Sequence, residues 1–117
     1  MSLPPAVRVF ICTQPADMRK SFDSLAALTR EVLRQDPMAG HLFVFRNRDG
    51  DRVKVLWWDR SGYSLWYKRL EAGAFKFPAG EGASAEVESA ELALLLEGID
   101  LAGAKRRKRF SFENRQK

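Results

Sequence analysis

Aromatic rings and cationic side chains are interleaved in one stretch of this chain, between Phe43 and Phe77. Nine of the 13 aromatic residues lie there, beside eight lysines and arginines. Rings stack on bases and cations hold phosphates, so strands that carry both can form a nucleic-acid surface. The same residue types can also form a core sheet with a solvated basic edge. The arrangement of the secondary-structure elements decides between the two interpretations.

Contact with backbone phosphates is the chemistry that we expect from the basic residues. Arg19 and Lys20 lie at a predicted helix start, where a bound phosphate is favourable. Solvation alone, or protection of a strand edge against pairing, explains the basic residues equally well. No residue is a convincing base reader, so we expect weak sequence specificity. The predicted nucleic-acid contacts in the body of the chain are Arg19, Lys20, Arg46, Arg48, Arg52, Lys54 and Arg69.

Five adjacent cations near the C-terminus form the strongest electrostatic element. Their mutual repulsion predicts a flexible basic tail over residues 105–117. Residues 79–104 contain six carboxylates and no lysine or arginine, whereas residues 1–78 contain 13 basic and eight acidic residues. The tail therefore either contacts DNA, with release of counterions, or folds back on the acidic segment. The five cations are Lys105, Arg106, Arg107, Lys108 and Arg109.

Carboxylates are the groups that a metal-dependent nuclease needs, and the chain offers several. Asp49 and Asp51 flank Gly50 in a predicted turn, where aspartate is favoured by local hydrogen bonding. Asp59 begins a second turn, and Asp17 suits a helix cap. Structural roles therefore explain these carboxylates better than metal ligation does.

Other catalytic chemistry has little support in the sequence. His41 is the only histidine and Cys12 the only cysteine, so a Cys/His metal site and an internal disulfide are excluded by number. No phosphate-binding glycine loop is present. We expect a protein that is not an enzyme and that needs no cofactor and no metal.

Composition and hydropathy indicate a soluble globular protein in the reducing cytoplasm. The hydrophobic fraction is 45% and the charged fraction 30%, with a formal net charge of +5. No apolar stretch approaches the roughly 20 residues that span a bilayer. The first residues lack the pattern of a signal peptide, and we expect no contact with a membrane.

Hydrophobic periodicity predicts a small single α+β domain over residues 1–104. It consists of an antiparallel meander of about four strands, an added N-terminal strand and two helices. Asp17 or Ser21 caps the first helix, which Pro37 and Gly40 close, and Ser89 caps the second. The expected strands are 7–12, 42–46, 53–58, 63–69 and 75–77, and residues 79–88 are expected to form an acidic, glycine-containing linker.

Turn chemistry fixes the register of the meander. With Asp49 and Gly50 at the centre of the first turn, Val44 lies opposite Val55. A symmetric second turn places Trp58 opposite Tyr63. Both sheet faces are then apolar, and the first helix can cover only one. The other face must meet the second helix, a protein or bases, although core packing explains many of its rings. Its predicted partner contacts are Phe43, Phe45, Trp58, Tyr63 and Tyr67.

Four segments of the sequence resemble a known family. PADMRKSFDSLAAL, HLFVFRNRDGDRVKVLWWD, GYSLWYKRLEAGAFKFP and ELALLLEGIDL are similar, in this order, to the TnpB-type accessory protein of the insertion-sequence sixty-six transposon family. The resemblance covers about Val7 to Leu101 and departs from the family pattern at Ser21, where a glycine is expected. It implies a bacterial mobile-element protein that acts beside a separately encoded transposase and lacks strand-transfer chemistry.

The resemblance and the residues together predict a non-catalytic accessory factor in DNA transposition. We expect it to bind transposon DNA, the transposase or both, and self-association is a further option. Two alternatives remain: a protein-interaction module without DNA binding, and a metal-dependent nuclease. The basic tail lies beyond the region of resemblance and gains no support from it.

Overall fold

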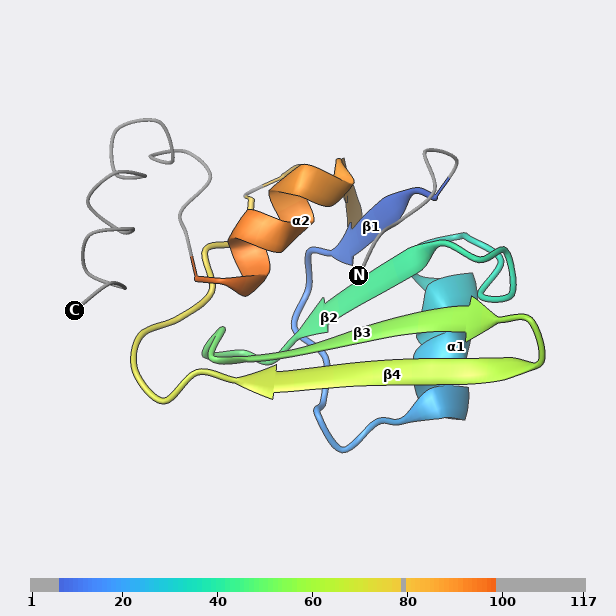
Figure 1. Ribbon diagram of the computed structural model, residues 1–117, viewed down its shortest axis with the longest axis horizontal. Helices are drawn as coiled ribbons and strands as arrows, with labels where there is room; N and C mark the ends of the chain where they lie inside the picture. Colours follow the sequence, from blue (N-terminus) through green and yellow to red (C-terminus); the bar gives the residue numbers. More distant parts are fainter. Residues whose placement is uncertain (1–6, 79, 99–117) are drawn as a thin grey trace.

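The computed structural model of the chain describes residues 7–78 and 80–98. In these residues a five-stranded sheet carries one helix on each face (Figure 1). The structure confirms the predicted α+β class. Among the described residues, no helix is long and apolar enough to cross a membrane.

The sheet is mixed, with the strand order β4-β3-β2-β1-β5. Strand β1 pairs in parallel with β2, and the other neighbours pair antiparallel. The N-terminal strand is therefore an interior strand of the sheet. The strands are β1 (Val9–Cys12), β2 (Leu42–Arg46), β3 (Arg52–Asp59), β4 (Gly62–Arg69) and β5 (Ser84–Val87).

Two expectations about the fourth meander strand and the linker were wrong. Phe75–Phe77 is not a strand: Phe75 is buried, and its N–H donates to the Gly50 carbonyl at 2.8 Å. The last strand instead lies inside the predicted linker 79–88, as β5. The residues of β5 have modest strand propensity. The backbone hydrogen bonds that β5 forms with the edge of β1 therefore decide its conformation, and not the preference of its own residues.

The predicted register of the meander is confirmed. Val44 pairs with Val55 across β2 and β3, and Trp58 pairs with Tyr63 across β3 and β4. Gly50 has a φ of +76°, a backbone conformation that glycine adopts without the steric cost of a side chain. Turn chemistry was therefore sufficient to set the register.

Helix α1 (Phe22–Glu31) begins after Ser21, one of the two predicted caps. It ends earlier than predicted, since Arg34 already has a φ of +56° before Pro37 is reached. Helix α2 (Ser89–Leu96) begins after Glu88 rather than Ser89, and the Glu88 N–H donates to Glu91 Oε1 at 3.0 Å.

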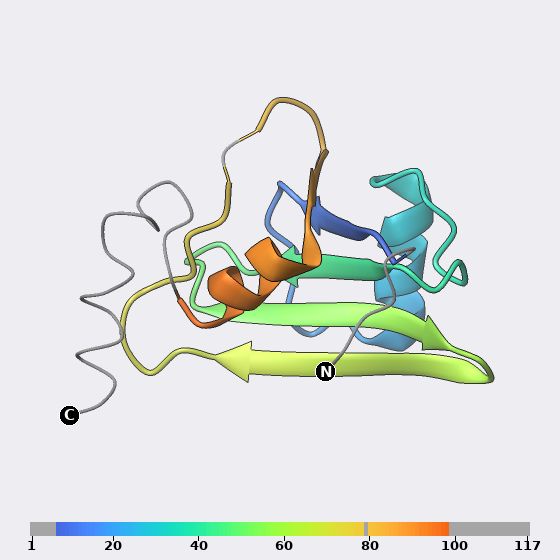
Figure 2. The same ribbon diagram turned by 45° about the horizontal axis from the view of Figure 1, so that its top comes forward.

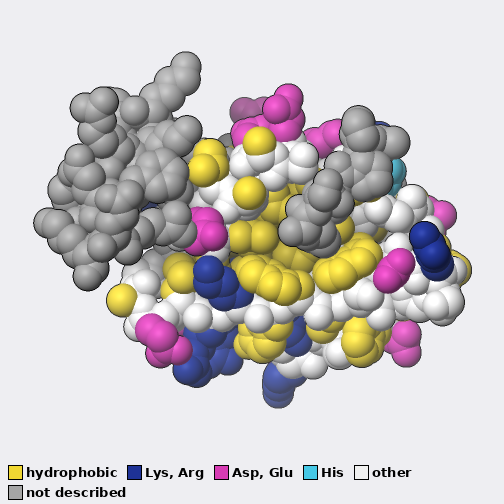
Figure 3. All heavy atoms as spheres, in the orientation of Figure 1, with side chains coloured by type: hydrophobic (Ala, Val, Ile, Leu, Met, Phe, Trp, Pro, Cys, Tyr) yellow, Lys and Arg dark blue, Asp and Glu magenta, His cyan; other side chains and the backbone are white. Residues whose placement is uncertain are grey.

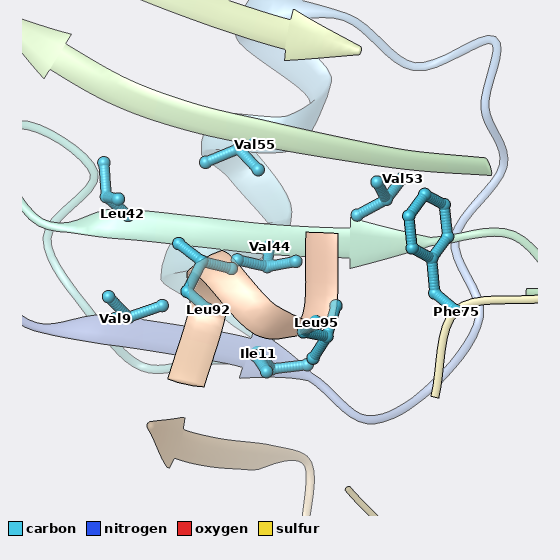
Figure 4. Packing of buried hydrophobic residues seen from close by; sticks show 9 residues of the cluster. All are labelled: Val9, Ile11, Leu42, Val44, Val53, Val55, Phe75, Leu92 and Leu95. Carbon is cyan, nitrogen blue, oxygen red and sulfur yellow. The ribbon is translucent and has the colours of Figure 1, made fainter. Parts of the chain in front are cut away.

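Each helix buries a separate hydrophobic core against the sheet. Leu25 and Leu33, from α1 and the turn after it, pack with Phe43, Phe45 and Leu56 on one face. On the other face, α2 contributes Leu92 and Leu95 (Figure 4). Their partners in the strands and in the 75–78 segment are Val9, Ile11, Leu42, Val44, Val53, Val55 and Phe75. Each of the two apolar faces of the sheet is thus packed against a helix over part of its area.

Candidate nucleic-acid interface

Two arginines lie directly opposite each other at one end of the β3–β4 pair. Arg52 and Arg69 are cross-strand partners, so their side chains leave the same face of the sheet. Like charges in this arrangement repel each other. One ion pair with a carboxylate offsets the repulsion: Arg69 Nη2 lies 3.0 Å from Glu71 Oε1, at the surface. An anion bound between the two guanidinium groups would relieve it further.

Tyr67 lies beside this arginine pair and is 47% exposed. Its hydroxyl oxygen is 3.4 Å from Arg52 Nη1. The Lys54 ammonium lies 4.7 Å from the centre of its ring, which is cation–π distance. Together Arg52, Tyr67, Arg69 and Glu71 line a shallow hollow of about 420 Å³, which we call the Arg52–Arg69 site. It offers two cations and one accessible ring.

Lys54 was predicted as a phosphate contact, and its burial corrects that prediction. The side chain is 7% exposed, and its ammonium donates to the Met18 and Lys20 carbonyls at 2.7 Å each. Burying an ammonium group is costly unless it is hydrogen-bonded, and these two carbonyls supply the bonds. Lys54 therefore fixes the segment before α1 on the sheet instead of facing solvent.

Arg19 and Lys20 precede α1 and are not equivalent. The exposed Arg19 guanidinium donates to the Asp17 carboxylate, with the shortest contact at 2.6 Å. The side-chain hydrogen bond from Arg19 lowers the pKa of Asp17 to about 2. Lys20 is half-buried, and its N–H donates to the Asp17 carbonyl at 3.0 Å. A phosphate at Arg19 would compete with an ion pair that is already formed.

Arg46 and Arg48 flank the first turn of the meander with different surroundings. Arg46 Nη2 donates to the Thr13 carbonyl at 2.6 Å, and its guanidinium lies 5.8 Å from the Phe77 ring centre. Arg46 therefore ties β2 to two other segments. Arg48 is exposed, and both arginines line an open hollow of about 450 Å³.

Two of the predicted partner contacts lie in the core, which corrects those predictions. Phe43 and Phe45 are both 0% exposed beneath α1. Trp58 and Tyr63 are half-buried and pack edge to face, with ring centres 5.0 Å apart. Of the five predicted aromatic contacts, Tyr67 is the most exposed, at 47%.

Two of the remaining candidate side chains, Asp51 and His41, accept hydrogen bonds within the described chain. Asp51 Oδ1 accepts a hydrogen bond from Asn47 Nδ2 at 2.6 Å, and His41 Nδ1 accepts one from the Arg8 N–H at 3.0 Å. Burial raises the pKa of the Cys12 thiol. Within residues 7–78 and 80–98, no three His, Cys, Asp or Glu side chains are grouped so as to hold a metal ion.

Sequence reasoning missed an apolar groove between α2 and β4. Trp57, Trp66, Leu92 and Leu96 line it, with a volume of about 370 Å³, and Figure 3 shows hydrophobic side chains gathered on this face. Lys68 and Leu96 both line this groove, and the Lys68 ammonium donates to the Leu96 carbonyl at 2.9 Å. The sequence carried one signal for it: two apolar sheet faces were predicted, and α2, with only eight residues, cannot cover the whole of the second face.

The predicted tail contacts at positions 105–109 lie outside the described residues. The charges that the structure places are therefore those of the body of the chain. Among the predicted contacts, the structure brings Arg52, Arg69 and Tyr67 together at the Arg52–Arg69 site, and it brings Arg46 and Arg48 together at a second hollow.

Comparison with known proteins gives a family match over most of the chain. The family model described as IS66 Orf2 like protein matches residues 7–106. "Uncharacterized protein y4hO" of Sinorhizobium fredii (strain NBRC 101917 / NGR234) is 48% identical over 94 residues, which cover 80% of this chain and 82% of that protein. "Uncharacterized protein y4jC" of the same strain is 38% identical over 101 residues, or 86% of each chain. No solved structure gives a significant match.

Proposed function

Since the chain belongs to the IS66 Orf2-like family and so has a transposition-associated accessory role, we propose that it acts by binding DNA. In this proposal it performs no strand chemistry of its own and works beside a separately encoded transposase in the bacterial cytoplasm. The observation that supports DNA binding is the Arg52–Arg69 site. Two arginines that repel each other across a ladder, beside an exposed ring, suit a phosphate and its neighbouring base.

Phosphate contact accounts for the arrangement of charge at this site. The guanidinium groups of Arg52 and Arg69 present parallel N–H donors, which match phosphate oxygens well. Glu71 neutralises only part of the charge, through an ion pair that is exposed and therefore weak. In this proposal both arginines hold phosphate and neither reads a base edge, so the binding that the site supports is largely independent of sequence.

The test compares two double variants with equal charge change. Arg52→Gln/Arg69→Gln removes the site, whereas Arg30→Gln/Arg34→Gln removes two exposed arginines on and just after α1. Fluorescence anisotropy with a labelled duplex, at two or more salt concentrations, measures the affinity. Because the first variant loses the phosphate held between the two guanidinium groups, its plot of log K against log salt should be flatter by about 0.9. The control should keep the wild-type slope.

Two other outcomes favour the competing functions. If no DNA shift occurs and the protein binds the transposase with little dependence on salt, it is a protein-interaction module. If Mg²⁺-dependent cleavage appears and is lost on Asp→Asn substitution, it is a nuclease. An equal effect of the two double variants would remove the Arg52–Arg69 site from the proposal.

A further inference from the structure

Strand β4 is one edge of the sheet, and its outer backbone groups have a definite pattern. Asp51 and Leu70 lie opposite each other, directly beyond the Arg52–Arg69 pair of the β3–β4 ladder. The Leu70 N–H donates to the Asp51 carbonyl at 2.8 Å, so Asp51 and Leu70 form a hydrogen-bonded pair. Bonded and non-bonded pairs alternate along an antiparallel ladder. Even-numbered residues from Gly62 to Lys68 therefore direct their N–H and C=O groups at β3. The outward groups belong to Tyr63, Leu65, Tyr67 and Arg69.

Nothing in the described part of the chain pairs with these outward groups. The sheet ends at β4, and Figure 2 shows no strand along its outer side. The strand is eight residues long and contains no proline, which would block pairing there. An uncovered edge of this kind is a template for another strand. The opposite edge, β5, has only four residues.

We propose that β4 pairs antiparallel with β4 of a second copy of this chain, about a two-fold axis at Trp66. The two sheets then form one continuous sheet. Outward backbone groups face outward groups: Tyr63 lies opposite the partner's Arg69, and Leu65 opposite the partner's Tyr67. The two-fold axis repeats each pair, so every outward N–H and C=O of the strand gains a bond.

The side chains favour a second copy in this register. Trp66, which is 38% exposed, lies opposite the partner's Trp66 beside the α2–β4 groove, so the pairing covers an exposed ring. Directly opposed aromatic residues are among the more stabilising cross-strand pairs. No cation faces a cation, since Ser64 lies opposite the partner's Lys68. Centring the axis at Lys68 instead would place two ammonium groups together.

Sedimentation equilibrium tests the proposal on the full chain. The wild type should have twice the chain mass of 13.3 kDa. Leu65→Pro removes one outward N–H and no bond to β3, so it should give a monomer with the wild-type circular dichroism spectrum. Trp66→Lys should weaken association at least about tenfold by placing two cations on the axis. Met38→Lys, at a site 51% exposed and far from β4 in sequence, is the matched control and should leave association unchanged.

Cross-linking tests the register. In the paired strands, residue 66 of each copy forms a non-hydrogen-bonded pair with a Cα separation of about 4.5 Å, which a disulfide can span. Trp66→Cys should therefore form an oxidised dimer, and Ser64→Cys should not. A wild-type monomer at every concentration would overturn the proposal. So would unchanged association of both Leu65→Pro and Trp66→Lys. None of these readouts depends on DNA binding.

Discussion

The residue whose role differs most from its sequence-based interpretation is Lys54. A lysine within a basic, aromatic stretch suggests phosphate contact, yet its ammonium donates to two carbonyls of the segment before α1. Those carbonyls are 36 and 34 residues away in sequence, so local pattern carries no sign of them. The same limit applies to Phe43 and Phe45. Strand alternation groups them on one face, but only the packed structure shows that α1 covers it.

Lys54→Met should lower the free energy of unfolding by about 1–3 kcal/mol, because two carbonyls lose a charged donor in a buried place. Urea unfolding followed by circular dichroism measures the change. Lys76→Met is the matched control, since Lys76 is exposed, and should change stability little. Equal stability of wild type and Lys54→Met would show that solvent replaces the missing hydrogen bonds.

Asp17 makes stability depend on pH in the acid range. Its pKa falls from 3.8 to about 2 in the folded chain, chiefly because Arg19 donates to the carboxylate. The Asp17 carboxylate binds a proton more readily in the unfolded chain than in the folded one. The stabilisation of the folded chain by the Asp17–Arg19 pair is therefore complete above pH 3.8 and is lost as the pH falls toward 2. The melting temperature of wild type should therefore exceed that of Asp17→Asn at about pH 5, and the difference should shrink by about pH 2. A difference independent of pH would contradict this, and Asp49→Asn, in an exposed turn, is the control.

At the scale of elements, the register of the three meander strands could be predicted from the sequence. The last strand and the end of the first helix could not. Two short turns set the register of β2, β3 and β4 because each acts on residues adjacent in sequence. Strand β5 was missed because its stability comes from β1, far earlier in the chain. The first helix was predicted too long because its apolar stripe continues through Leu33, which is buried in the turn after α1 and not in the helix.

Helix α2 depends on two leucines for its attachment to the sheet. Leu95 is 0% exposed in the core on that face, so Leu95→Ala should cost about 2–5 kcal/mol of unfolding free energy. Leu94, half-buried on the same helix, is the control, and Leu94→Ala should cost clearly less. Chemical unfolding of the two variants makes the comparison. Equal destabilisation would mean that α2 is not anchored through Leu95.

At the scale of the whole molecule, charge is divided between a body that the structure describes and a basic tail outside the described residues. Residues 105–117 contain seven of the 20 lysines and arginines. If the tail contacts DNA, truncation after Gly103 should lower the affinity and flatten the salt dependence by about 0.9 for each phosphate that the tail neutralises. DNA titrations of the full and truncated chains measure this. Unchanged affinity and slope would assign the binding to the body alone.

The position of β1 between β2 and β5 has a consequence for synthesis of the chain. Val9 pairs with Leu42 on one side and with Val87 on the other, so β1, which is made before the other described strands, is among the last of them to be completed. Contacts between residues so far apart in sequence slow folding. Until the ribosome has released residues 84–87, one edge of β1 stays open to other nascent chains. Translation that stops short of β5 would therefore release a product prone to aggregation.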